Sequence, residues 1–206
     1  MLINIHTHHK QKIGIEIIHS KEELDTPFSY GIGPFELEKY VFDEKMTQKN
    51  NCISIGEIGL DKIIQIKLNK QIIKFKEQLN YAEKLKLPVI IHCVKAYNEL
   101  IQIKHEIRPN QPWIIHGFRK TTLLESLLKE GFYISIGTAI LHDTKLQETI
   151  KNIPNDKLFL ETDNDEKHTI DEVYMKVAFI KELSLLDLET IIFNNFKTVF
   201  KKWEIG

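Results

Sequence analysis

The sequence, 206 residues long, predicts an α/β fold with a mostly parallel sheet. Short apolar segments alternate with longer segments of helical periodicity, which is typical of repeated strand–helix units. Several apolar segments are almost uninterrupted by polar residues, as expected for strands that are buried on both faces. The length suits a single domain, residues 1–206, with a sizeable core.

Three short segments with strand character open the chain. Residues 3–8 form a strand in which His6 and His8, two positions apart, point to the same face. Residues 13–19 form a second strand after a polar break, and residues 28–33 form a third. The first connection is shorter than the dozen residues that a parallel crossover usually needs, so we expect the second strand to run antiparallel to the first.

The remainder of the chain alternates more regularly. Apolar Ile72, Phe75 and Leu79 recur at three- and four-residue steps and predict an amphipathic helix over residues 68–87. The other predicted strands lie at residues 52–57, 88–92, 113–116, 131–137 and 158–163. The other predicted helices lie at residues 35–49, 96–107, 121–130, 145–152 and from 170 to the end, with a break near 184–187.

Composition excludes several classes of protein. The net charge of -1 provides no basic field of the kind that nucleic-acid-binding proteins carry, so a nucleic acid would be held through local contacts. Cys52 and Cys93 cannot form a disulfide framework, and we expect buried, reduced thiols in a cytoplasmic protein. No segment is long and apolar enough to cross a bilayer, so no membrane association is expected. No obligate protein partner is indicated.

Side chains that bind metal ions stand at the ends of four predicted strands. The carboxyl ends of parallel strands meet at one face of a (β/α) barrel, where active sites lie. We therefore expect these four side chains to lie together, joined by the two histidines of the first strand. The candidate metal ligands are His6, His8, Glu57, His92, His116 and Asp163.

Six ligands exceed what one tetrahedral ion needs, which favours two divalent ions. A carboxylate has two oxygens, so Glu57 is the natural bridge. One ion would take the first two histidines and Asp163, and the other would take His92 and His116. Two ions about 3.5–4 Å apart activate water and stabilise a leaving oxygen, which favours hydrolysis of phosphate esters.

The carboxylates have further candidate roles. Glu57 and Asp163 are the candidate catalytic residues, and Asp163 either binds metal alone or also orients and deprotonates the attacking water. Glu161 is either a partner of a ligating histidine or a buried carboxylate satisfied by backbone. We expect Asp61 to cap the following loop rather than to reach the site rim. Surface or packing roles are expected for His9, His19, His105, His142 and His168.

These motifs, in this order, resemble those of the TatD family of metal-dependent hydrolases. The segments that carry the resemblance run from residue 3 to residue 163 and include Gly56-Glu57-Ile-Gly-Leu-Asp61 and Leu160-Glu-Thr-Asp163. The resemblance implies a TIM-type barrel with two divalent ions, Mg, Mn or Zn, held by the six ligands above. Several relatives are DNA exonucleases, so it also implies phosphodiester cleavage of DNA from an end.

The chain departs from the family pattern at positions expected near the substrate. Asn4 stands where the family has Asp, Gly33 replaces a histidine, Val94 an arginine and Arg119 a serine. The first crossover helix is missing, and the proline usually found after Asp163 is absent. We therefore expect a distorted barrel that ends in two C-terminal helices.

Two other functions fit the same motifs. One is a hydrolase of a small ester, amide or phosphoester, as in the wider amidohydrolase superfamily. Many members of that group bridge their metals with a carboxylated lysine, so Glu57 favours the nuclease-like reading. The other is a metal-binding protein without catalysis, which the lost substrate groups would favour.

Overall fold

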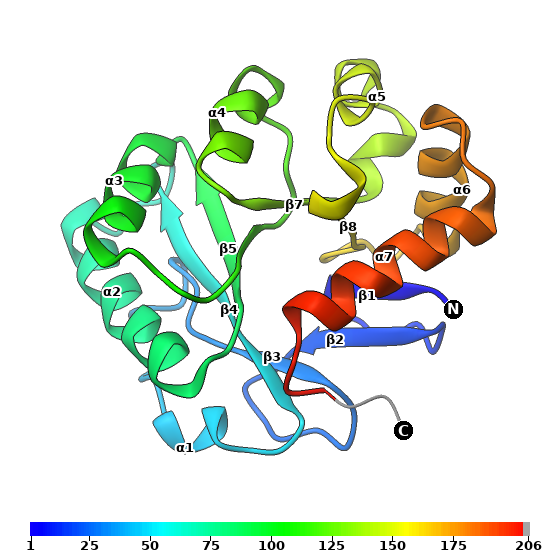
Figure 1. Cartoon of the computed structure of the whole chain (residues 1–206). Coiled ribbons are helices and arrows are strands. Elements are labelled where there is room, and N and C mark those ends of the chain that lie inside the picture. The colour runs from blue at the N-terminus through cyan, green and yellow to red at the C-terminus, as the bar shows by residue number, and fades with distance from the viewer. Residues whose placement is uncertain (204–206) are drawn as a thin grey trace. The chain divides into compact units, whose positions relative to one another are not determined.

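The computed structural model describes residues 1–203 and shows strands and helices in alternation (Figure 1). Strand order in the sheet follows chain order. The strands are β1 (Ile3–Thr7), β2 (Ile15–His19), β3 (Phe28–Tyr30), β4 (Cys52–Asp61), β5 (Val89–Val94), β6 (Trp113–Ile115), β7 (Tyr133–Ile136) and β8 (Leu158–Leu160). The helices are α1 (Glu44–Thr47), α2 (Leu68–Leu85), α3 (Tyr97–Ile107), α4 (Leu124–Lys129), α5 (Thr144–Ile150), α6 (Ile170–Ile180) and α7 (Leu185–Val199).

Short 3-10 helices complete the chain: η1 (Thr121–Leu123), η2 (Thr138–Leu141) and η3 (Asn155–Lys157). The pairs β1–β2, β3–β4, β4–β5, β5–β6 and β7–β8 are all parallel. A parallel bridge between Thr7 and Asp163 places the first strand beside the last. This is the topology of a TIM-type (β/α) barrel, so the predicted fold class is confirmed. Within residues 1–203, no helix combines the length and the apolar character needed to span a membrane.

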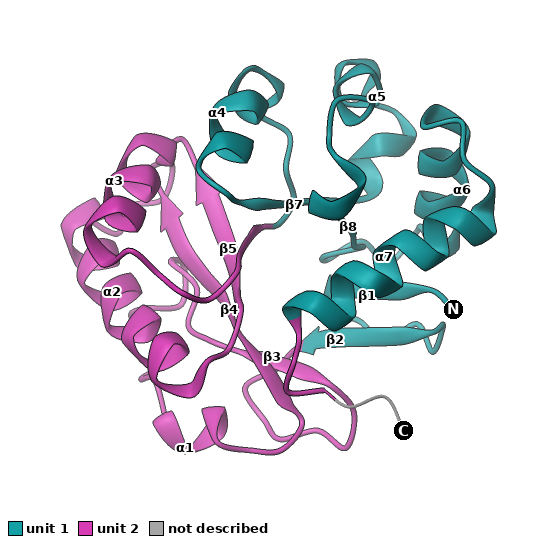
Figure 2. Cartoon of the chain, viewed as in Figure 1, with its two compact units in different colours: residues 1–18, 116–199 teal, residues 19–115, 200–206 magenta. Residues whose placement is uncertain are grey.

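Contacts between residues divide the chain into two compact units (Figure 2). Unit 1 holds residues 1–18 and 116–199, and unit 2 holds residues 19–115 with the segment that begins at residue 200. Each unit therefore contains strands and covering helices of its own. The single-domain expectation for residues 1–206 stays a prediction.

In unit 1, helices α6 and α7 cover strands β8 and β1. Tyr174 of α6 ties that helix to β1, because its hydroxyl donates to the carbonyl of Ile3 and accepts from the Ile3 amide, both at 3.0 Å. Asn195 of α7 donates to the carbonyl of Leu158 at 2.9 Å. These buried hydrogen bonds fix β1, which contains His6, and β8, which precedes Asp163.

In unit 2, helices α2 and α3 lie along the strands β4 and β5 (Figure 1). The apolar face of α2 buries Phe75, whose ring meets Trp113 at a centroid distance of 6.0 Å. Gln78 of the same face exchanges hydrogen bonds with both backbone groups of Ile32, at 2.7 and 3.1 Å. The helix predicted over residues 68–87 is therefore confirmed as α2, and its polar buried positions serve the backbone of a neighbouring loop.

The expectation that the second strand runs antiparallel to the first is wrong. Ile3 pairs with Ile15 in a parallel register. The connection over residues 8–14 is sufficient without a helix, because seven extended residues span about 25 Å and a five-residue strand is shorter. Gly14 closes this turn with φ +69, where a Cβ atom would lie 2.1 Å from the Leu2 carbonyl oxygen.

Two boundaries also differ from prediction. Only α1 is helical within residues 35–49, where it begins after Asp43, whose carboxylate accepts from the Lys45 amide at 3.0 Å. Strand β4 does not end at Glu57 but continues to Asp61 with every residue buried. Strand β4 remains paired with β5 up to Asp61, because a glycine at position 59 permits the two strands to approach closely. A Cβ atom at Gly59 would lie 1.9 Å from the His92 carbonyl oxygen.

Other elements agree with the sequence within a few residues. The missing helix between β1 and β2 and the two C-terminal helices, with their break before Leu185, are confirmed. Cys52 and Cys93 are free and buried, as expected. Burial raises the pKa of the Cys52 thiol to about 11 and that of Cys93 to about 12, so both are neutral near pH 7.

Candidate metal centre

Four of the six predicted ligands lie in unit 1, and three of them form a close group. His6 lies in β1, His116 follows β6 directly, and Asp163 follows β8. Each offers one ligand atom, and these atoms lie within 4.8 Å of one another. The His6 side chain is fully buried, with its Nε2 atom 3.4 Å from an Asp163 oxygen, whereas the Asp163 side chain is 42% exposed. Imidazole nitrogens and a carboxylate oxygen form a donor set that suits a divalent transition metal.

Backbone hydrogen bonds hold Asp163 against the first strand. The Asp163 amide donates to the His6 carbonyl at 3.0 Å, and the His8 amide donates to the Asp163 carbonyl at 3.0 Å. Asp163 itself has φ 54, in the left-handed region that side-chain-bearing residues seldom adopt. His8 adds its Nε2 atom 3.6 Å from the same carboxylate. The structure therefore brings the predicted His6, His8 and Asp163 together within unit 1.

Unit 2 holds the other two predicted ligands side by side. His92 places Nδ1 2.9 Å from a Glu57 oxygen and Nε2 3.1 Å from an Asp61 oxygen. A neutral imidazole has a single N–H, so it donates to only one of these carboxylates. An ion at Nδ1 would leave the Nε2 proton for Asp61, which is the usual carboxylate–histidine–metal arrangement. Asp61 also accepts from the Ile63 amide at 2.7 Å, so it caps the loop as expected and contacts His92 as well.

Glu161 has contacts that match both roles considered from the sequence, a carboxylate satisfied by backbone and a neighbour of a predicted histidine ligand. Its side chain is fully buried, and one oxygen accepts from the Gly117 amide at 2.6 Å while lying 3.4 Å from Nδ1 of His116. Its other oxygen accepts from the hydroxyl of Ser135. Glu161 is therefore a backbone-satisfied carboxylate that also lies beside His116.

Comparison with known proteins identifies the family. A family model described as TatD related DNase matches residues 2–201. The chain belongs to this family. It is a metal-dependent hydrolase, in keeping with relatives that bear this description.

The relatives of this TatD-family chain include both uncharacterised hydrolases and named nucleases. An uncharacterised metal-dependent hydrolase, YabD of Bacillus subtilis, is 28% identical over 80% of this chain and 71% of its own length. A putative deoxyribonuclease TATDN1 homolog of Vairimorpha ceranae is 26% identical over 89% of this chain and 82% of its own length. A 3'-5' ssDNA/RNA exonuclease TatD of Erwinia tasmaniensis is 34% identical over 58% of this chain and 48% of its own length.

Solved structures show the same fold. The TatD homolog YJJV of Escherichia coli superposes with a TM-score of 0.75 at 22% identity, covering 85% of this chain and 76% of that one. A TatD-family hydrolase from Entamoeba histolytica gives a TM-score of 0.71 at 21% identity, covering 85% and 75% of the two chains. The TIM-type barrel of the TatD family is thus the fold of this chain.

Asn4, which departs from the family motif, has a structural place in this TatD-family chain. It is fully buried, and its amide donates to the Thr162 hydroxyl at 2.8 Å. Its carbonyl accepts from the Thr162 amide at 3.2 Å. A side-chain amide satisfies both contacts without burying a charge, so Asn4 joins β1 to the segment that carries Asp163.

His19 is the functional candidate that the sequence misses. It was expected to have a surface or packing role, yet its side chain is only 6% exposed and its Nδ1 lies 2.8 Å from the Gly56 carbonyl oxygen. Lys21 contacts Nε2 of His19 at 3.0 Å and donates to Glu36 at 2.6 Å. The contact braces the backbone next to Glu57, and no local pattern signals it because it joins strands far apart in sequence.

The remaining histidines fit surface and packing roles. His9 lies 2.7 Å from the Asn164 side-chain oxygen. His168 lies 2.9 Å from Asp165, and its ring centroid is 5.2 Å from that of His142. His105 is exposed on α3. Within the described residues, these histidines belong to none of the ligand groups around Asp163.

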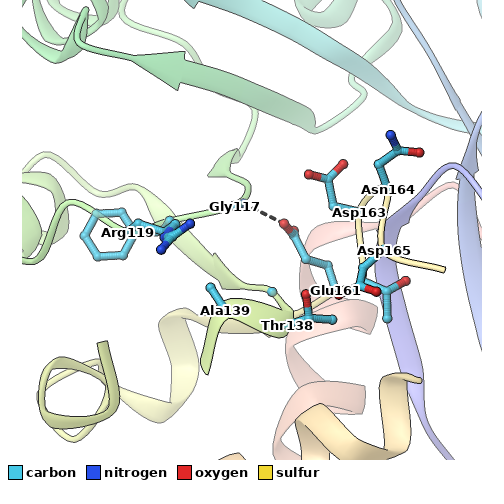
Figure 3. A pocket seen from close by; sticks show the side chains of 11 residues that line it. Gly117, Arg119, Thr138, Ala139, Glu161, Asp163, Asn164 and Asp165 are labelled. Carbon is cyan, nitrogen blue, oxygen red and sulfur yellow. Dashed lines mark hydrogen bonds between the residues drawn. The ribbon is translucent and has the colours of Figure 1, made fainter. Parts of the chain in front are cut away.

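A cavity of about 320 Å³ opens beside Asp163 in unit 1 (Figure 3). Its walls come from the loop after His116, from the start of η2 and from the segment after β8. Figure 3 shows Arg119 across the cavity from Asp163 and Asn164. The volume lies within the range of small-molecule sites, so one nucleotide-sized group fits next to the candidate ligands.

Proposed function

We propose that this TatD-family hydrolase cleaves phosphodiester bonds of single-stranded DNA from an end, using two divalent ions. The observation that carries the proposal is the grouping of His6, His116 and Asp163, whose ligand atoms lie within 4.8 Å of one another. The names of the Vairimorpha ceranae and Erwinia tasmaniensis relatives support a nucleic acid as substrate. The cavity beside Asp163 supports a substrate that is bound one nucleotide at a time.

The proposed ligands are those expected from the sequence at the strand ends. In the barrel fold these residues follow or lie near the carboxyl ends of strands, where catalytic residues of TIM barrels come from. Glu57 is proposed as the bridge because a carboxylate has two oxygens and so can bind two ions. The proposed ligands are His6, His8, Glu57, His92, His116 and Asp163. When bound, the ions supply Lewis acidity that polarises the phosphoryl oxygens and lowers the pKa of a water molecule.

The side chains are proposed to position the water, accept its proton and orient the imidazoles. Asp163 is proposed to orient the attacking water and to accept its proton, since its carboxylate is 42% exposed and thus open to the cavity. The water oxygen forms a bond to phosphorus while the ester P–O bond breaks, and the departing oxygen takes up a proton from bulk water. Glu161 and Asp61 keep the imidazoles of His116 and His92 in their orientations through the contacts described above.

The test is nucleotide release from end-labelled single-stranded oligonucleotides with protein loaded with magnesium, manganese or zinc. We expect shortening from one end, and a loss of at least about 100-fold in kcat for Asp163→Asn, because the variant lacks the proton acceptor. An anomalous-scattering map of metal-loaded crystals should show two peaks that flank Glu57. Absence of nucleotide release with all three metals, with identical behaviour of Asp163→Asn, would contradict the proposal.

A further inference from the structure

The cavity beside Asp163 has one cationic side chain among its lining residues. Arg119 stands on one side, and the carboxylates Glu161, Asp163 and Asp165 stand on the other (Figure 3). An acidic cavity would repel a nucleic acid, so the partners of each carboxylate decide what the cavity attracts.

Each carboxylate has its own partners within unit 1. Glu161 accepts from the Gly117 amide and from the Ser135 hydroxyl. Asp165 accepts from the Lys167 amide at 2.8 Å and lies 2.9 Å from Nδ1 of His168. Asp163 belongs to the proposed metal centre, where divalent ions more than offset its charge. Arg119 is the one cation in the cavity wall, and the partners of Glu161 and Asp165 described here are other groups than Arg119.

The side chain of Arg119 is only weakly fixed in its position. The side chain is 67% exposed, and its guanidinium lies 3.6 Å from an Asp143 oxygen, beyond ordinary hydrogen-bond distance. Asp143 is already engaged, since it caps α5 by accepting from the Leu146 amide at 3.1 Å. An exposed ion pair of this kind contributes little to stability. The guanidinium is therefore able to exchange Asp143 for an anionic ligand with little loss.

We propose that Arg119 binds a phosphate of the nucleic-acid strand next to the scissile one, an inference that rests on the proposed function. A guanidinium donates two parallel hydrogen bonds to phosphate oxygens, which a lysine ammonium does not. Arg119 lies three residues after His116, in the wall of the cavity. Its guanidinium therefore supplies a positive charge near the bond that is cleaved. It makes the chain selective for strands over small phosphodiesters that have no flanking phosphate.

The first test compares Arg119→Ala and Arg119→Lys with Lys120→Ala, a neighbouring exposed cation outside the cavity lining. On single-stranded oligonucleotides we expect Arg119→Ala to raise KM by about 10- to 100-fold with little change in kcat. Arg119→Lys should fall between, and Lys120→Ala should stay within about twofold of wild type. On bis(p-nitrophenyl) phosphate, which has no flanking phosphate, Arg119→Ala should match wild type. Equal KM changes for Arg119→Ala and Lys120→Ala would overturn the inference.

A second test locates the phosphate. In an oligonucleotide with a neutral methylphosphonate next to the cleaved bond, wild type should bind as weakly as Arg119→Ala, and the mutation should have no further effect. Asp143→Asn keeps a good helix cap but removes the competing charge, so it should not weaken binding. If Asp143→Asn reproduces Arg119→Ala, the arginine acts only through its surface ion pair, and the inference fails.

Binding of an uncleavable oligonucleotide, with methylene in place of the bridging ester oxygens, to metal-loaded protein separates this inference from the proposed function. Fluorescence anisotropy of a labelled oligonucleotide needs no cleavage, and Arg119→Ala should weaken binding and reduce the salt slope of log K by about 1. A wild type that binds through Arg119 yet cleaves nothing would overturn the nuclease proposal alone. A wild type that cleaves while Arg119→Ala binds and cleaves normally would overturn the Arg119 subsite alone.

Discussion

The two groups of proposed ligands are held in different ways. In unit 1, Asp163 and His8 lie just beyond their strands, are 42% and 31% exposed, and are connected by backbone hydrogen bonds. In unit 2, Glu57 and His92 lie inside strands β4 and β5, with side chains only 7% and 16% exposed. A buried ligand pair surrounded by side-chain partners suits a fixed metal position, whereas a partly exposed carboxylate suits contact with water and substrate.

Removing a ligand should have the largest effect, and the effect should differ between the two groups. We expect Glu57→Gln to lose bound metal and to lower nucleotide release by at least about 100-fold, because its second oxygen anion is needed for the bridge. His8→Asn, which changes a more exposed ligand, should retain more metal. Metal content after dialysis and kcat measure both. Equal retention of metal in the two variants would remove the distinction between the groups.

Changing the carboxylate partners should have the next largest effect. Asp61→Asn in unit 2 and Glu161→Gln in unit 1 should each weaken metal binding by about 10- to 100-fold, because each leaves a ligating imidazole less firmly oriented. Isothermal titration with zinc or manganese measures the dissociation constants. Glu161→Gln should also lower the melting temperature, since Glu161 is fully buried with two donors. Unchanged metal affinity in both variants would show that these contacts are only structural.

The support of β1 should produce a smaller effect, on stability. Tyr174→Phe removes the hydroxyl that bonds both backbone groups of Ile3, so the free energy of unfolding should fall by about 1–3 kcal/mol. Amide exchange should increase in β1 more than in β4, since the contact belongs to unit 1. Urea unfolding and hydrogen exchange test this. An exchange increase spread evenly over both units would mean that they unfold together.

The pH dependence of unit 2 should show the smallest effect. Burial raises the pKa of Glu36, but the neighbouring His19 and the hydrogen bond from Lys21 outweigh burial and lower it from 4.5 to about 2. A depressed carboxyl pKa stabilises the folded chain above the unfolded pKa, and this stability is lost as pH falls from about 4.5 towards 2. Between about pH 5 and pH 3, wild type should lose more stability than Glu36→Gln. Urea midpoints across this range measure it, and parallel curves for the two proteins would contradict the assignment.

Much of the fold was predictable because its signals are local. The three- and four-residue steps of Phe75 and its neighbours predict α2, and the unbroken apolar runs predict β5 and β8. The candidate ligands were predictable for a related reason. A polar residue at the end of a buried strand has few structural uses, so His116 and Asp163 stand out from the sequence around them.

Other features were decided by contacts between distant segments. The direction of β2 follows from its register with Ile3 and from the turn at Gly14, not from the length of the connection. The contact of Asp61 with His92, the contact of Glu161 with Gly117 and the contact of His19 with Gly56 each join residues at least 31 positions apart. Such contacts leave no periodicity in the sequence, since each depends on where two strands or loops meet.

By itself, then, the sequence determined the α/β barrel class, the candidate metal ligands at the strand ends and membership of a hydrolase family. These depend on residue type and on spacing along the chain, which the sequence states directly. Tertiary structure alone decided which carboxylates lie beside His92 and His116, why Asn4 is tolerated in β1, and that Arg119 faces Asp163 across a cavity. These depend on distances through space, and such distances exist only once the chain has folded.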